Sequence, residues 1–183
     1  VFFSGGKRGL QIELDPNDDV AYNNRGITKH NLKDYEGAIV DYTKAIEMDP
    51  NYVRAFRNRG NAKMNLNDHK GAISDYTKAT VIDPNYSIAY RKRGDAKRQL
   101  KDYEGAIGDY TKAIELDPED ATAYFNRGNS RFNLNDYEEA IADYTTAIEI
   151  DPEFVDAYIN IGSLKKKLRD YKDALENYSK AID

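Results

Sequence analysis

Hydrophobic and polar positions recur along most of the chain with a period of 34 residues. The triplet Asp-Tyr-Thr and the pair Arg-Gly each return four times at that spacing, beginning at Asp41, Asp75, Asp109 and Asp143 and at Arg25, Arg59, Arg93 and Arg127. These spacings define five repeats, residues 19–52, 53–86, 87–120, 121–154 and 155–183, and positions are numbered from 1 within each. A fixed period over five copies indicates a repeat protein.

Each repeat carries the punctuation of two helices. Position 32 is proline in the first four repeats, and a proline ends one helix and precedes the next. Position 16 is aspartate in all five, which is a preferred N-cap. The pattern predicts helix A at positions 1–14 and helix B at positions 17–30. Glycine at position 8 costs roughly 1 kcal/mol against alanine inside a helix, so its five copies predict a tight contact between helices.

The start of helix B differs between repeats. Position 19 is Gly37, Gly71 and Gly105 in the first three repeats, but Glu139 and Asp173 in the last two. Glu139 stands three residues after the N-cap Asp136, which is the spacing of a capping box. We therefore expect helix B to exchange its amide hydrogens faster in the first three repeats.

The fixed positions also carry a family resemblance. An aromatic residue at position 4, Gly at 8, Ala at 20, Tyr at 24, Ala at 27 and Pro at 32 resemble the tetratricopeptide repeat over residues 17–183. The resemblance implies an all-α fold, a right-handed superhelical solenoid of antiparallel helix pairs with helix A on its concave side. Residues 1–16 stand apart, and residues 10–16 are similar to the end of a preceding helix B. Because residue 1 is valine, we expect a piece of a longer protein.

Helix geometry sorts helix A into two faces. Positions 2, 5, 6, 9, 12 and 13 share one face, here called the variable face because its residues change from repeat to repeat. The opposite face, with alanine at 3, glycine at 8 and leucine at 14, is predicted to be buried. Seven basic and two acidic residues give the variable face a charge of +5, against −10 for the remainder of the chain. This asymmetry predicts an acidic partner, with a merely solvated face as the alternative.

The variable face supplies the candidate peptide-binding residues. Position 6 is Asn24, Asn58, Lys92, Asn126 and Asn160. Carboxamides both donate and accept hydrogen bonds, so they can hold the backbone of an extended peptide. This resembles the asparagine ladder in the tetratricopeptide superhelix of O-GlcNAc transferase, although inherited duplication is the alternative. The basic residues that would attract acidic side chains are Arg54, Arg57, Arg91, Lys92 and Arg98.

Two phenylalanines of repeat four interrupt the polar pattern of the variable face. Phe125 and Phe132 are seven residues apart, at positions 5 and 12, and so share one helical stripe. They could form an apolar pocket beside Arg91 and Arg98. Contact with helix A of an adjacent repeat is the alternative, and the spacing favours neither.

Position 7, in the middle of the predicted buried face, is arginine in four repeats. A buried guanidinium needs a carboxylate, and position 23 supplies one. The predicted structural ion pairs are Arg25–Asp41, Arg59–Asp75, Arg93–Asp109 and Arg127–Asp143. In repeat five both charges disappear together, as Ile161 and Asn177, which favours the pairing over a role for the arginines in ligand binding.

Composition excludes several classes of function. The 183 residues contain no cysteine and only two histidines, so no catalytic site, metal site or cofactor is predicted. No apolar run approaches the roughly 18 residues of a membrane span. The net charge of −5 argues against nucleic acid as a partner. The compartment stays unknown, with the cytoplasm only as a default.

These observations predict a non-catalytic scaffold that binds an acidic peptide or protein segment in a concave groove. One alternative is self-assembly, because Tyr171, Leu175, Tyr178 and Ile182 would form an apolar face at the end of repeat five. Such a face could stack on the N-terminal end of another copy and give a homo-oligomer. RNA binding, as in pentatricopeptide repeats, is a further alternative that the acidic composition disfavours.

Overall fold

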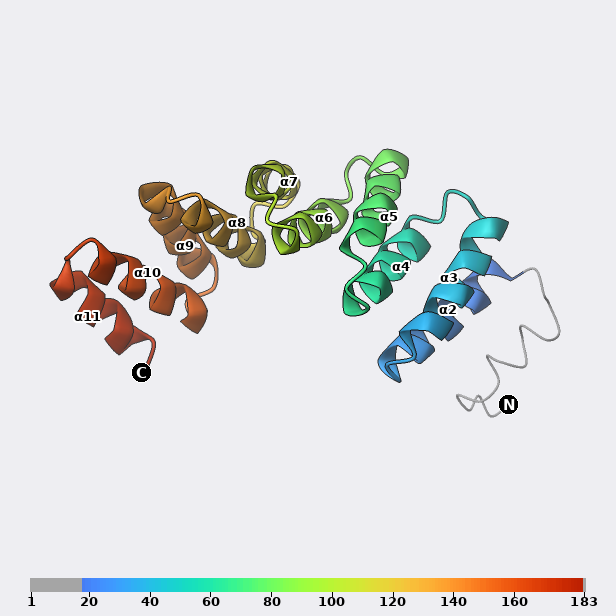
Figure 1. Cartoon of the computed structure of the whole chain (residues 1–183), viewed down its shortest axis with the longest axis horizontal. Helices are drawn as coiled ribbons and strands as arrows, with labels where there is room; N and C mark the ends of the chain where they lie inside the picture. The colour runs from blue at the N-terminus through green and yellow to red at the C-terminus, as the bar shows by residue number, and fades with distance from the viewer. Residues whose placement is uncertain (1–17, 183) are drawn as a thin grey trace. The chain divides into compact units, whose positions relative to one another are not determined.

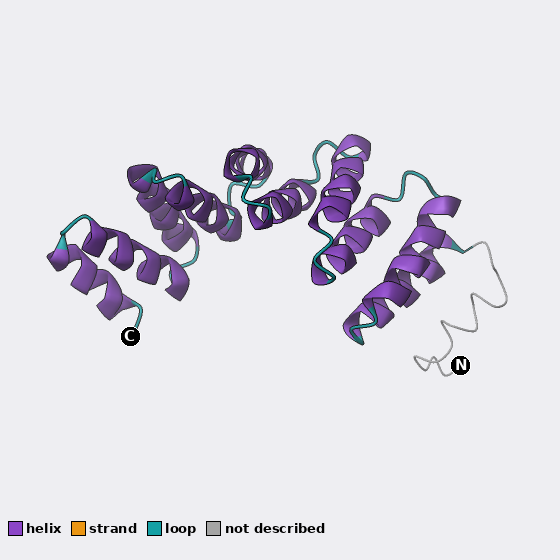
Figure 2. Cartoon of the chain, viewed as in Figure 1, coloured by secondary structure: helices purple, strands orange, loops and turns teal. Residues whose placement is uncertain are grey.

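The computed structural model describes residues 18–182, and the predictions for residues 1–16 lie outside the described residues. Over that range the chain forms ten helices and no strand, which confirms the all-α prediction (Figures 1 and 2). The A helices are α2 (Asp19–Asn31), α4 (Val53–Asn65), α6 (Ser87–Gln99), α8 (Ala121–Asn133) and α10 (Val155–Lys167). The B helices are α3 (Tyr35–Met48), α5 (His69–Ile82), α7 (Tyr103–Leu116), α9 (Tyr137–Ile150) and α11 (Tyr171–Lys180).

Two compact units make up the structure, residues 1–96 and residues 97–183, and each is described by itself. They are called the N-terminal part and the C-terminal part below. In the N-terminal part α2 packs on α3, α3 on α4 and α4 on α5. In the C-terminal part α7 packs on α8, and the contacts continue through α9 and α10 to α11. None of the helices in the described range is long and apolar enough to cross a bilayer.

Helix A ends one residue earlier than predicted, and this changes the place of leucine 14. The residue at position 15 has a positive φ in all five repeats, between 60° and 65°. In repeat one, Lys33 N–H donates to His30 O and Asp34 N–H donates to Lys29 O, both at 2.9 Å, which is the Schellman motif of a helix C-terminus. Leucine 14 therefore leaves the helical face, and Leu32 is 76% exposed. The prediction that leucine 14 is buried is wrong.

The start of helix B does not follow the capping pattern that the sequence predicts. Asp34, Asp68 and Asp102 accept hydrogen bonds from the glycine N–H at position 19 at 2.9–3.0 Å. A Cβ on Gly71 would lie 2.1 Å from Asp68 Oδ2, so glycine permits this close cap. Asp136 makes no such bond in α9, so the expected capping box with Glu139 does not form. The first three repeats thus gain about 1 kcal/mol from a cap that offsets the cost of glycine.

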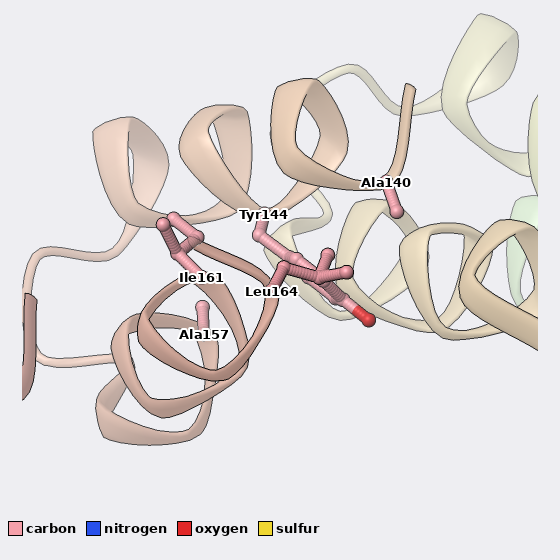
Figure 3. Packing of buried hydrophobic residues seen from close by; sticks show 5 residues of the cluster. All are labelled: Ala140, Tyr144, Ala157, Ile161 and Leu164. Carbon is pink, nitrogen blue, oxygen red and sulfur yellow. The ribbon is translucent and has the colours of Figure 1, made fainter. Parts of the chain in front are cut away.

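In repeats one, two and four the core of the helix pair is a buried tyrosine ring laid against the glycine at position 8. Tyr42, Tyr76 and Tyr144 are at most 1% exposed, and alanines surround them. A Cβ on Gly128 would lie 2.8 Å from the Tyr144 ring and 3.2 Å from the backbone oxygen of Ala140. Figure 3 shows Tyr144 in one such cluster, with Ala140, Ala157, Ile161 and Leu164. The predicted tight helix contact at glycine 8 is thus formed in the described pairs.

The contact gives a matched pair of stability predictions. Gly128→Ala is expected to destabilise the chain by about 1–3 kcal/mol, because neither the buried ring nor the backbone can move aside. Gly108→Ala, on α7, is expected to stabilise by about 0.5–1 kcal/mol, because a Cβ there meets nothing within 4 Å. Urea unfolding followed by circular dichroism measures both. Equal shifts in the two variants would show that the ring does not restrict position 8.

Candidate functional site

A buried aspartate at position 23 is the centre of an ion network. Asp41 is fully buried and accepts hydrogen bonds from Arg25 Nε at 2.8 Å and Nη2 at 2.6 Å. Lys29 Nζ lies 2.9 Å from Asp41 Oδ2, the oxygen that also accepts from Arg25 Nε. Arg25 and Lys29 stand four residues apart on α2, so one helical face presents both cations to α3. The aspartate is therefore held as an anion by two partners.

The same network returns in other repeats. Arg59 and Lys63 bind Asp75 at 2.7 and 2.8 Å, and Arg127 and Arg131 both bind Asp143 at 2.7 Å. In repeat three Lys97 lies 2.8 Å from Asp109. The remaining predicted pair, Arg93 with Asp109, would join residues of the two parts and stays a prediction.

Sequence reasoning missed two members of this network. The basic residue at position 11 is the second cation, and threonine 25 of the preceding repeat is a further acceptor: Arg59 Nη1 donates to Thr43 and Arg127 Nη1 to Thr111, each at 3.1 Å. Position 11 is basic in all five repeats, which was the available signal. In repeat five, where the aspartate is missing, Lys165 instead binds Asp173 at 3.0 Å.

The network sets the protonation of the aspartate. Burial raises the pKa of the Asp41 carboxyl, but the hydrogen bonds from Arg25 and Lys29 outweigh it, and the net pKa lies below its ordinary value. Its contribution to stability is therefore present above the unfolded pKa and is lost as the pH falls through the folded one. The Asp41 carboxylate thus holds α2 and α3 together.

Hollows open on the variable face, and three of them are described. One, about 450 Å³, lies in the N-terminal part and is called the α2–α4 hollow; its lining is Val20, Asn23, Asn24, Ile27, Tyr52, Arg54, Arg57, Asn58, Tyr86 and Ile88. The His30 hollow, about 300 Å³, is lined by His30, Asn61, Met64, Asn65, Tyr76, Lys92 and Asp95. The Arg98 hollow, about 370 Å³ in the C-terminal part, is lined by Arg98, Asn129, Phe132, Asn133, Tyr144, Asn160 and Ser163. Positions of the variable face supply most of each lining.

The position-6 asparagines do not share one environment. Asn58 is 7% exposed, and its Nδ2 donates to Asn23 Oδ1 at 3.0 Å, while its Oδ1 accepts from Arg57. One of its two N–H groups and its oxygen are thus used within the protein, and Asn58 also lines the α2–α4 hollow. Asn160 donates one N–H to Asn129 Oδ1 at 3.0 Å. Asn24 and Asn126 are half-buried on the same face.

The predicted basic residues divide in the same way. Arg54 is exposed at the α2–α4 hollow, whereas Arg57 is half-buried and its guanidinium also lies 5.9 Å from the Tyr86 ring. Lys92 lies 3.5 Å from Asp95, which neutralises part of its charge. Arg91 and Arg98 are half-buried.

The two phenylalanines have different surroundings, so they do not form one pocket. Phe125 packs into the core of Figure 3, with ring centroids 4.7 Å from Phe154 and 5.6 Å from Tyr144. Both ring partners belong to repeat four, and the core that Phe125 packs against also contains Ala157, Ile161 and Leu164 of α10. Phe132 is 39% exposed and lines the Arg98 hollow. Among residues 18–182, no group of histidine, aspartate or glutamate side chains could hold a metal ion.

Comparison with protein families settles the class of the chain. Family models described as tetratricopeptide repeat match residues 20–52, 53–86, 121–154 and 155–183, and one described as TPR repeat matches residues 94–135. The chain belongs to the tetratricopeptide repeat family. Tetratricopeptide repeat (TPR) proteins are typically non-catalytic, and the repeats and fold are those of a protein-interaction scaffold.

Solved structures with the same fold agree. A crystal structure of MamA matches with a TM-score of 0.82 and 29% identity, over 86% of this chain and 92% of that one. YrrB, described as a TPR protein with an unusual peptide-binding site, matches at 0.78 and 26%, over 96% and 91%. PilF of Pseudomonas aeruginosa matches at 0.82 and 22%, over 90% and 75%, and shows the fold alone. Curated protein sequences give no match.

Proposed function

We propose that this TPR chain binds an extended, acidic peptide segment on the variable faces of its A helices. The observation that carries the proposal is that these hollows are lined mainly by positions of that face, where residues change between repeats. A surface that varies while its frame stays constant is typical of ligand selection on a repeat scaffold. The likeness to YrrB supports a peptide as the ligand.

Charge in the α2–α4 hollow favours an acidic segment. Its lining contains Arg54 and Arg57 and no acidic residue. Val20 and Ile27, which are 50% and 37% exposed, add apolar surface for the side chains between the acidic ones. Asn24 is half-buried and can bond the peptide backbone, whereas Asn58 is 7% exposed and gives one of its two N–H groups to Asn23.

The test measures the binding kinetics of labelled twelve-residue peptides that differ only in carrying Asp and Glu or their amides. Arg54→Glu is expected to slow association of the acidic peptide about tenfold at low salt and less at high salt, because steering is screened within about 8–10 Å. Lys44→Glu, an equal charge change at a half-exposed residue of α3, is the control. Equal binding of the acidic and amide peptides by the parent would contradict the proposal.

Self-association is a second candidate, favoured by the last helix. Tyr171, Leu175 and Ile182 are 65–85% exposed, so α11 presents an apolar face. At the other end Arg25 is 40% exposed, against 17% for Arg59, whose Nη1 binds a threonine of the preceding repeat. Ser179 stands at that threonine position and could accept from Arg25 of a second copy. Light scattering across concentration tests this, with Leu175→Glu expected to abolish any increase in mass.

A further inference from the structure

Two of the hollows are copies of one another. The His30 hollow and the Arg98 hollow use the same seven repeat positions, 68 residues apart. In both, position 12 of one repeat meets positions 9, 12, 13 and 24 of the next and positions 6 and 9 of the one after. Equivalent repeat positions therefore line one hollow in each part.

The residues that both hollows share, here called the frame, are asparagine at positions 9 and 13 and tyrosine at position 24. Tyr76 OH donates to Asn61 Oδ1 and Tyr144 OH donates to Asn129 Oδ1, each at 2.8 Å. The frame oxygen of Asn129 also accepts from Asn160, so both of its lone pairs are used. The amide N–H groups of Asn129 are the part of that side chain able to donate to a peptide carbonyl.

The other lining residues differ between the two hollows. The His30 hollow has Met64 at the second position 12 and holds its own acid, since Lys92 lies 3.5 Å from Asp95. The Arg98 hollow has Phe132 at that position, with one cation and no acidic residue in its lining. The first copy is internally balanced in charge, and the second is not.

Arg98 lacks an acceptor where it needs one. Its Nε–H is buried and has no hydrogen-bond partner among the residues that the structure describes. Leaving a buried donor unsatisfied is costly, so a shift of the Arg98 side chain that brings its guanidinium to an anionic ligand oxygen would be favoured. Beside it, Phe132 exposes 39% of its surface, and the Lys167 ammonium lies 5.6 Å from its ring. The hollow thus offers a guanidinium to a carboxylate and an aromatic face to an apolar side chain.

We propose that the Arg98 hollow is the specificity site of the C-terminal part and binds a carboxylate side chain together with a neighbouring apolar side chain of the peptide. The inference rests on the proposed function, because it names the chemistry that one variable face selects. Arg98 pairs with the carboxylate, Phe132 covers the apolar side chain, and Asn129 donates to the peptide backbone. The equivalent His30 hollow does not make this selection.

The experiment compares equilibrium binding of a labelled peptide with alternating Asp and Leu to the full chain and its variants. Arg98→Gln is expected to weaken binding about 10- to 100-fold, because a charge-assisted hydrogen bond is lost. Lys112→Gln, an equal loss of charge at a half-exposed residue of α7, is the control and is expected to change it less than about twofold. A peptide with Asn in place of Asp should bind weakly and be insensitive to Arg98→Gln, since the interaction is already absent.

Phe132→Ala tests the apolar half of the site. It is expected to weaken the Asp–Leu peptide about five- to tenfold and to leave an Asp–Ser peptide unchanged. If Arg98→Gln binds like the parent while Arg54→Glu weakens binding, the specificity site is overturned and the proposed function stands. If the parent binds neither the acidic nor the amide peptides, both proposals fail.

Discussion

Asp75→Ala is expected to destabilise the chain by about 3–5 kcal/mol, because it leaves two cations unpaired in a half-buried site. Asp75 is 2% exposed and is bound by Arg59 at 2.7 Å and by Lys63 at 2.8 Å. Urea unfolding followed by circular dichroism measures the change.

Repeat five provides the design of the compensating variant. There Ile161 and Asn177 replace the arginine and the aspartate. The lysine at position 11, Lys165, instead pairs with Asp173, with Nζ 3.0 Å from Oδ2. The triple change Arg59→Ile, Gly71→Asp and Asp75→Asn copies this arrangement into repeat two. It is expected to recover at least about half of the loss. The recovery is not complete, because a Cβ at position 71 pushes the Asp68 carboxylate away and lengthens its hydrogen bond from the N–H of residue 71.

The surface pair of Lys44 and Glu47 is the control for this series. Its partners are 51% and 55% exposed, so Glu47→Ala is expected to cost less than about 0.5 kcal/mol. If the triple variant has the same free energy of unfolding as the single Asp75→Ala variant, the buried pairing is not the source of the stability.

Alkaline unfolding between pH 10 and 12 is the second large effect expected. Burial raises the pKa of Tyr42 and of Tyr144 from 10.0 to about 12, and burial raises the pKa of Tyr76 as well. The folded chain therefore holds these protons where the unfolded chain has released them. The contribution of each tyrosine to the free energy of unfolding is fully present below the unfolded pKa of 10.0. It falls by about 1.4 kcal/mol per pH unit as the pH rises from there to the folded pKa.

Three such tyrosines amount to roughly 8 kcal/mol over two pH units, which is comparable with the whole stability of a domain. The phenolate absorbance of the parent minus that of Tyr144→Phe isolates one buried ring among the 15 tyrosines, and it is expected to rise together with the loss of helical circular dichroism. Tyr144→Phe should also make the fall of stability with pH shallower, because one titrating group is removed. A difference signal that appears near pH 10 while the helices are intact would contradict the burial of the Tyr144 ring.

The sequence by itself determined the architecture of the repeats. A 34-residue period, proline at 32 and aspartate at 16 fix where helices begin and end, because these signals act within a few residues of the chain. The pairing of Arg59 with Asp75 was also readable, because repeat five loses both charges together. Local chemistry repeated five times is the reason these predictions succeeded.

The tertiary structure decided which variable residues a ligand can reach. Asn58 and Arg54 both belong to the variable face, yet Asn58 is buried against Asn23 while Arg54 is exposed. Phe125 and Phe132 share a stripe, yet Phe125 fills the core between repeats and Phe132 lines a hollow. Helical period gives the direction of a side chain, but the distance to the neighbouring helix decides whether it meets protein or solvent, and that distance is set by packing between repeats.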